Sequence, residues 1–142
     1  MYELVSPINH RAVIKYIGIL LVIFAVAMFV PVFAGIILGE IGSAMYYAAT
    51  SLVVLIFGYS LYRLLPEYEL ETKEATIIAA LIFPISALIS SIPMSLSTGM
   101  PLIDAFFESV SAITTTGLSV APADMNPLFL FTRSWSQWLG GI

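Results

Sequence analysis

The sequence predicts an all-α integral membrane protein: three full transmembrane helices, a re-entrant half-helix with a filter-like loop, and the start of a further transmembrane helix. Of the 142 residues, 60% are hydrophobic and 10% are charged, whereas a soluble domain carries about 25% charged residues. The charges gather near the N-terminus and in one central cluster, which leaves uncharged stretches long enough to cross a bilayer. The absence of cysteine excludes disulfides and thiolate sites. The sequence contains no basic patch of the kind that binds nucleic acid.

The N-terminal part is expected to hold two transmembrane helices. Residues 1–12 are polar and precede an uncharged run, Tyr16–Gly39, with Asn9 placed to cap the first helix. No small-residue cleavage site follows this run, so it is interpreted as a retained helix rather than a signal peptide. Pro31 predicts a kink inside it. A second uncharged run, Ile41–Tyr62, completes a region of two additional helices over residues 13–66.

A hydrophilic loop at 67–74 separates these helices from the rest of the chain. It carries four carboxylates, Glu67, Glu69, Glu71 and Glu74. Without a histidine or a glycine-shaped turn they do not resemble a calcium site. We therefore expect a solvated loop that leads into the next helix.

Residues 75–142 are interpreted as one incomplete helix–loop–helix repeat. The third full span, Ala75–Ser97, is rich in serine near its far end, which favours close helix packing. His10 is the single histidine and lies far from these serines. A serine-hydrolase relay therefore has no base, and no enzyme is predicted.

A short helix is predicted after Pro101. From Pro101 to Ala112 the chain has room for about 18 Å of helix at 1.5 Å per residue. This is little more than half of a bilayer, so both a surface helix and a re-entrant helix fit. Phe106, Phe107, Val110 and Ile113 form an apolar stripe along it. A last apolar run, Leu128–Ile142, is short of a full span, from which we expect a truncated product or a piece of a longer protein.

The distribution of basic residues predicts the orientation. Arg11 and Lys15 precede the first span, and Arg63 and Lys73 flank the loop between the second and third spans. The turn at Glu40 between the first two spans has no basic residue. The positive-inside rule therefore places the N-terminus and the 67–74 loop in the cytoplasm. The half-helix then enters from outside, with its C-terminal end toward the membrane centre.

The polar stretch Thr114, Thr115, Thr116, Gly117 and Leu118, here named the threonine loop, follows this half-helix. A helix C-terminus carries about half a negative charge, and an extended loop can turn its carbonyl oxygens toward an ion. Threonine favours an extended backbone, and glycine permits backbone angles closed to other residues. From the residues alone, a cation-selecting loop and an ordinary membrane-buried turn both remain open. Polar backbone at this depth must in either case be buried in protein or line water.

Three polar or charged side chains stand out near the threonine loop. Glu108 and Ser111 lie on the half-helix and are interpreted as braces for it. Arg133, near the start of the last helix, is expected either to pair with an acidic partner or to add positive potential outside the loop. With no base, nucleophile or metal partner beside Glu108, an intramembrane enzyme fits the sequence poorly.

Two segments carry a resemblance to a known family. They are residues 106–117 (FFESVSAITTTG) and residues 133–142 (RSWSQWLGGI). The first resembles the first pore segment of the Trk/Ktr/HKT family of potassium transporters, and the second is similar to the start of the following helix. TrkH-type members also resemble this chain in having two extra helices before the first pore unit. The chain therefore looks like the N-terminal portion of such a member.

The resemblance implies a function and an assembly. Four helix–pore–helix repeats surround one pore in the cell membrane, often in a homodimer, and a cytosolic nucleotide-binding subunit commonly gates it. Residues Thr114–Leu118 would then form the first of four filter loops, with K⁺ as the one metal, transported rather than held, and no covalent cofactor. Glycine at the filter position goes with potassium in this family, and serine in the first repeat with sodium, so Gly117 points to potassium. The alternative is a truncated, non-conducting membrane fragment or assembly subunit, because one loop supplies one quarter of a filter.

Overall fold

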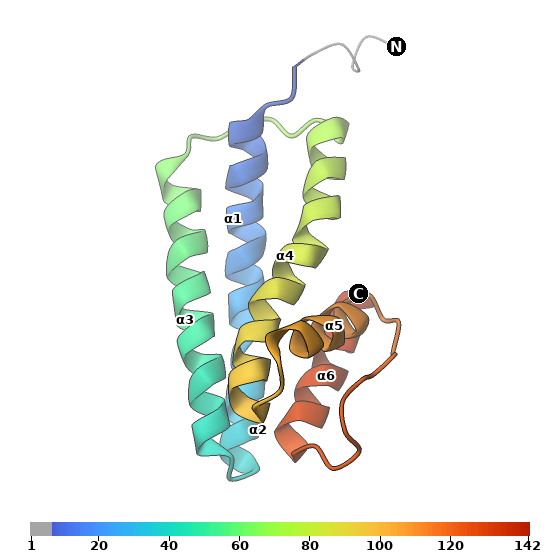
Figure 1. The fold of residues 1–142 in the computed structure, drawn as a ribbon. Helices are drawn as coiled ribbons and strands as arrows, with labels where there is room; N and C mark the ends of the chain where they lie inside the picture. The colour runs from blue at the N-terminus through green and yellow to red at the C-terminus, as the bar shows by residue number, and fades with distance from the viewer. Residues whose placement is uncertain (1–6) are drawn as a thin grey trace.

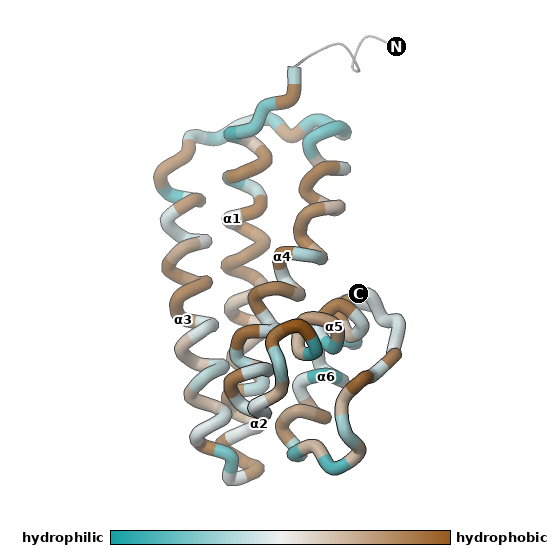
Figure 2. Tube along the Cα trace, in the orientation of Figure 1, coloured by the Kyte–Doolittle hydropathy of each residue, from teal (hydrophilic) through white to brown (hydrophobic). Residues whose placement is uncertain are grey.

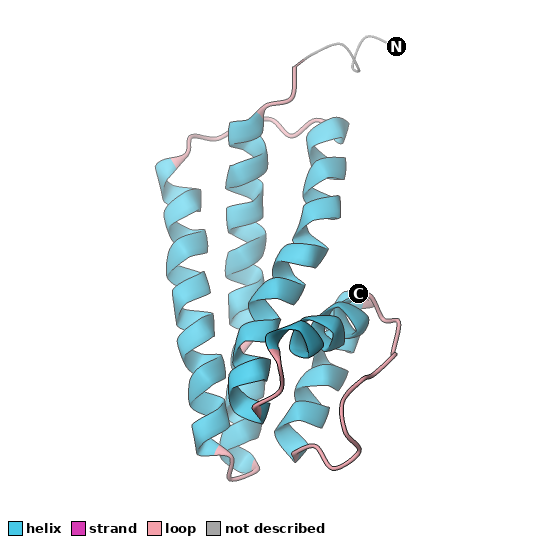
Figure 3. Cartoon of the chain, in the orientation of Figure 1, coloured by secondary structure: helices cyan, strands magenta, loops and turns pink. Residues whose placement is uncertain are grey.

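The computed structural model describes residues 7–142, and the described chain is helical without strands (Figure 3). The first six residues of the predicted N-terminal segment lie outside this range. The helical segments are α1 (His10–Ala27), α2 (Phe29–Ile37), α3 (Ile41–Leu64), α4 (Thr72–Thr98), α5 (Leu102–Ile113) and α6 (Pro127–Gly140).

Three stretches in the described range are long and apolar enough to cross a membrane. They are His10–Ile37 with 28 residues, which joins α1 and α2, Ile41–Leu64 with 24, and Thr72–Thr98 with 27. In Figure 2 apolar residues dominate these long helices, while hydrophilic residues gather at the end that holds the α3–α4 loop. The predicted all-α membrane fold class is confirmed.

The three spans run side by side, and the two short helices pack against one end of them (Figure 1). The helix α5 lies across the second half of α4, and α6 lies beside α5 and α2. The C-terminal residue sits about midway along the long helices, beside α5 (Figure 1). The loop between α5 and α6, which holds the threonine loop, therefore lies against the protein at this depth.

The first span is one helix with an interruption. Asn9 caps it as predicted, because its side-chain oxygen accepts a hydrogen bond of 3.2 Å from the Ala12 amide. The break falls at Met28, three residues before Pro31. Proline has no N–H and its ring crowds the carbonyl four residues earlier, so Ala27 loses its helical hydrogen-bond donor. The predicted kink is therefore centred one turn before the proline.

Two glycines set the close approach of α1 and α3. A Cβ atom at Gly18 would lie 3.0 Å from the Gly58 carbonyl oxygen, and one at Gly58 would lie 2.8 Å from the Gly18 carbonyl oxygen. Small residues that let backbones touch are the usual means of packing helices in membranes, where lipid is as apolar as a side chain. This pair fixes the two N-terminal spans against each other.

The loop predicted at 67–74 is shorter than expected. Because α4 begins at Thr72, Glu74 lies in its first turn and is 2% exposed, so the expectation of an exposed carboxylate there was wrong. The Glu74 carboxylate accepts a hydrogen bond of 3.0 Å from the Asn9 amide. Tyr16 donates its hydroxyl to the Tyr68 carbonyl at 2.9 Å. These contacts draw the loop over the start of α1 and bury the carboxylate.

The helix α5 has 12 residues, as the sequence predicts, and its buried face combines apolar residues, Ile113 among them, with polar ones. Glu108, Ser109 and Ser111 are buried, whereas Phe107 on the apolar stripe is 40% exposed. In apolar surroundings a polar side chain is costly on the outside, so it turns toward the protein interior. The Glu108 carboxylate and the Ser111 hydroxyl group thereby face the loop that follows α5, and the Ser109 hydroxyl group faces Met94 of α4.

Candidate functional site

The threonine loop leaves α5 through a tight turn. The Thr115 amide bonds to the Ala112 carbonyl and the Thr116 amide to the Ser111 carbonyl, both at 2.9 Å. This pair of bonds is the Schellman arrangement that closes a helix, with its left-handed residue usually a glycine. Here that residue is Thr115, with φ of 58°, a conformation that costs a β-branched residue about 1–2 kcal/mol. Strain of this kind persists where the surroundings impose it.

The Glu108 carboxylate holds the far side of the loop. One oxygen, Oε1, accepts hydrogen bonds from the Ser119 hydroxyl at 2.7 Å, the Val120 amide at 2.6 Å and the Ala121 amide at 3.0 Å. The side chain is fully buried. A buried carboxylate is tolerated when donors of this number surround it. Glu108 therefore ties the end of the loop back to the middle of α5.

Arg133 compensates the charge of Glu108 and binds the loop as well. Its Nε lies 2.8 Å from the second carboxylate oxygen, Oε2, as an ion pair that lacks the alignment of a hydrogen bond. Its NH2 group donates to the carbonyl oxygens of Gly117 at 3.0 Å and Leu118 at 2.5 Å. Of the two roles that the sequence left open for Arg133, the geometry supports pairing with an acidic partner.

The carbonyl oxygens of the threonine loop fall into two groups. The carbonyl oxygens of Gly117 and Leu118 accept hydrogen bonds from Arg133. The Leu118 carbonyl oxygen also accepts a hydrogen bond of 2.6 Å from the Ser111 hydroxyl group. Within residues 7–142, no group donates to the carbonyl oxygens of residues 114–116. These three residues are exposed. The hydroxyl groups of Thr114 and Thr116 lie 2.8 Å apart.

The chemistry of these free oxygens suits a weakly held monovalent cation. In the described range, no group of three or more His, Asp or Glu side chains gathers to hold a metal. The available ligands are neutral carbonyls and hydroxyls at the C-terminal end of a helix, where the dipole favours a cation. Neutral carbonyls replace hydration water without binding so tightly that the ion stays.

The helix α6 packs against the threonine loop and the end of α5. Gly140 packs so closely on the end of α5 that a Cβ atom there would overlap the Ile113 carbonyl oxygen. Gln137 lies about one turn before Gly140 on α6, and its side-chain nitrogen would lie 3.4 Å from a Cβ atom at Gly117. With Arg133, these residues present one face of α6 to the loop.

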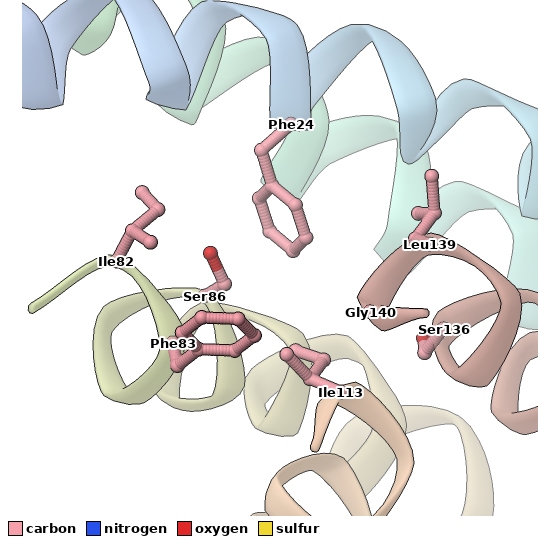
Figure 4. Close-up of a pocket in the computed structure, with 8 residues that line it drawn as sticks. All are labelled: Phe24, Ile82, Phe83, Ser86, Ile113, Ser136, Leu139 and Gly140. Atoms are coloured by element: carbon pink, nitrogen blue, oxygen red, sulfur yellow. The ribbon is translucent and has the colours of Figure 1, made fainter. Parts of the chain in front are cut away.

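A small cavity lies beside this contact (Figure 4). It measures about 190 Å³ and lies where α1, α4, α5 and α6 meet. Its lining residues are Phe24, Ile82, Phe83, Ser86, Ile113, Ser136, Leu139 and Gly140. The lining is apolar except for two hydroxyl groups, so the cavity offers no charged or carbonyl-rich ion site comparable with the threonine loop.

The structure brings together all the residues that the sequence singled out around the loop. Glu108, Ser111 and Arg133 each bond or pair with residues 117–121. Sequence reasoning missed the acceptor role of Glu108 toward the backbone after Leu118, because amide donors leave no residue-type signal. It also missed Gln137, although its position four residues after Arg133 places both on one helix face.

Comparisons with known proteins agree with this geometry. No family model matches the chain. The potassium uptake protein TrkH of the Trk system from Vibrio parahaemolyticus is 29% identical over 140 residues, covering 94% of this chain and 29% of that protein. TrkH from Halomonas elongata is 31% identical over 140 residues, covering 93% of this chain and 28% of that protein.

A solved structure resembles the fold over the same extent. The crystal structure of the potassium transporter TrkH from Vibrio parahaemolyticus matches with a TM-score of 0.84 and 30% identity, covering 94% of this chain and 30% of that one. The chain thus spans less than a third of the length of these relatives. The relatives are transporters, which confirms the prediction of a non-enzyme. The chain is thus homologous to TrkH-type proteins of the Trk/Ktr/HKT family over 93–94% of its length, as the two segments in its sequence predict.

Proposed function

We propose that this chain supplies one cation-coordinating loop, Thr114–Leu118, to a potassium-uptake pore in the cell membrane. The observation that carries the proposal is the division of carbonyls in the threonine loop. Arg133 and Ser111 hold the Gly117 and Leu118 carbonyls, whereas no group in residues 7–142 donates to the Thr114–Thr116 carbonyls. A loop held at one end with free oxygens at the other suits the replacement of a hydration shell. Because the relatives are potassium uptake proteins, we assign potassium as the ion.

The electrostatic setting supports a cation at residues 114–116. The Glu108–Arg133 pair is neutral as a whole, so it can anchor the loop without a net charge beside the oxygens. The last carbonyls of α5 add the negative end of the helix dipole. In this assignment Leu118, predicted with the filter, anchors the loop, and Glu108 and Ser111 act as supports.

Substitution of Gly117 tests the proposal. Gly117 has φ of 79°, a conformation that disfavours any side chain. In the assembled transporter, meaning this chain with the remaining pore repeats, Gly117→Ser should reduce discrimination against sodium. The measurement is rubidium uptake with sodium as competitor. Gly42→Ser is a suitable control, because a Cβ atom at Gly42 meets nothing within 4 Å and its φ is not positive. Unchanged selectivity in Gly117→Ser with normal uptake would count against the assignment.

The assembly that we propose needs partners. One loop is one quarter of a filter, so the remaining repeats come from the same longer chain or from other copies. A homodimer and a cytosolic nucleotide-binding regulatory subunit are part of the same proposal. The N-terminus and the α3–α4 loop would face the cytoplasm, because the basic residues near them obey the positive-inside rule. Labelling of a cysteine introduced at Glu67, in intact and opened cells, tests this orientation.

A second candidate is a non-conducting fragment or assembly subunit. Its ground is that one threonine loop cannot surround an ion by itself. Purified chain reconstituted alone in vesicles separates the two readings. Rubidium uptake by the chain alone would support assembly from several copies. Uptake that appears only with the remaining repeats would assign the chain a part in a larger pore.

A further inference from the structure

The helix α6 has two opposite faces with different partners. At about 100° per residue, Arg133, Gln137 and Gly140 fall within about 60° of one another, and all three contact the threonine loop or the end of α5. Leu128 and Trp135 fall on the opposite face by the same count. Both contact the kinked first span. The helix therefore stands between the kink and the threonine loop.

The contact of Trp135 with the first span is specific in chemistry. Its indole Nε1 donates a hydrogen bond of 3.0 Å to the carbonyl oxygen of Ala27. That carbonyl is the one whose helical donor would be the amide of residue 31, which proline lacks. In a region without water, an unpaired carbonyl costs several kcal/mol. The hydrogen bond from Trp135 thus supplies a donor to the Ala27 carbonyl oxygen, which lacks a helical donor because residue 31 is proline.

Contacts at the start of α6 also fix the position of this helix against the first span and the turn that follows it. The Glu40 carboxylate accepts a hydrogen bond of 3.1 Å from the Leu128 amide, at the positive end of the α6 dipole. A Cβ atom at Gly35 would lie 3.0 Å from a methyl group of Leu128. These contacts hold the start of α6, and Trp135 holds its middle. Arg133 lies two residues before Trp135, so a shift of the indole moves the guanidinium group that binds the Gly117 and Leu118 carbonyls.

We infer that Trp135 is a positioning residue for the threonine loop, acting through the Ala27 carbonyl that Pro31 leaves without a helical donor. The first span thereby helps to set ion selectivity, although it lies on the far side of α6 from the loop. This inference rests on the proposed function, because selectivity is the property that the position of the loop would control.

The test compares two tryptophans in the assembled transporter. Trp135→Phe removes the donor and keeps an aromatic ring. Trp138→Phe is the matched control, because Trp138 stacks on Trp135 at 5.0 Å and is 57% exposed. We expect Trp135→Phe to reduce the ratio of rubidium to sodium uptake by about two- to tenfold, the equivalent of one net hydrogen bond. Trp138→Phe should leave the ratio unchanged. An unchanged ratio in Trp135→Phe, with normal expression, would overturn the inference.

A double-mutant cycle decides the matter if Trp135→Phe fails to assemble. Pro31→Ala restores an amide donor for Ala27, so Trp135→Phe should do less damage to expression and thermal stability in that background. Equal damage in both backgrounds would overturn the inference.

Hydrogen exchange provides a readout independent of transport, since the Thr116 and Gly117 amides bond to the Ser111 carbonyl. Faster exchange there in Trp135→Phe than in Trp138→Phe supports the inference even if Gly117→Ser disproves the filter. Equal exchange in the two variants would contradict it.

Discussion

Two loops of this protein are held by a buried carboxylate on a neighbouring helix, and they differ in how that charge is compensated. At the α3–α4 loop, Glu74 accepts a hydrogen bond from the Asn9 amide and lies 3.9 Å from Lys73. At the α5–α6 loop, Glu108 accepts from three donors and pairs with Arg133 at 2.8 Å.

The difference follows from the surroundings of each loop. The α3–α4 loop lies at the hydrophilic end of the long helices (Figure 2), where water is close and a lysine at 3.9 Å suffices. The threonine loop lies beside the middle of the helices (Figure 1), where an uncompensated carboxylate is costly. The comparison indicates that depth decides how closely a buried carboxylate is paired with a cation.

Removal of Glu108 should break the α5–α6 loop and give the largest effect. Glu108→Ala leaves Arg133 without its counter-ion and three donors without an acceptor. The expected loss of stability is about 3–5 kcal/mol. Thermal unfolding in detergent measures it, with Glu74→Ala as the matched variant in the other loop, for which a loss of about 1–3 kcal/mol is expected. Normal stability of Glu108→Ala with abolished transport would instead assign Glu108 a direct role.

A substitution at Gly140 tests the support of the same loop from α6. The added methyl group of Gly140→Ala would overlap the Ile113 carbonyl, so α5 and α6 must separate. Overpacking of this kind costs about 1–3 kcal/mol. Gly42→Ala serves as control, since a Cβ atom there meets nothing within 4 Å. If the two variants unfold at the same temperature, the close contact of α6 with α5 does not support the loop.

The smallest effect is expected at the α3–α4 loop. Tyr16→Phe removes the hydroxyl donor to the Tyr68 carbonyl, a partly buried bond of 2.9 Å. One such bond contributes about 0.5–1.5 kcal/mol, and water near the loop end can replace it. Limited proteolysis of this loop should become faster, while Tyr59→Phe, at a side chain 53% exposed, should leave the rate unchanged. No change in Tyr16→Phe would show that the remaining contacts of the loop, such as the 3.2 Å hydrogen bond from Lys15 to the Leu65 carbonyl, hold it without the Tyr16 hydroxyl group.

The sequence by itself determined the helices and the position of the polar loop, because both depend on local patterns. Uncharged runs of bilayer length predict spans, and Asn9 marks a helix start through its own side chain. The 12-residue length of α5 follows from the spacing of Pro101 and the threonine run. Recognition of Glu108, Ser111 and Arg133 as support residues also needed only residue type and placement.

Tertiary structure alone decided which groups pair. Glu74 was expected in a solvated loop, and its burial depends on an amide 65 residues earlier. The carbonyl that Pro31 frees is predictable from the chain, but its donor, Trp135, lies 108 residues from Ala27. The division of the loop into held carbonyls at Gly117 and Leu118 and free ones before them depends on where α6 places Arg133. Such contacts join segments that are far apart in the sequence. They therefore depend on tertiary packing and cannot be predicted from a local sequence pattern.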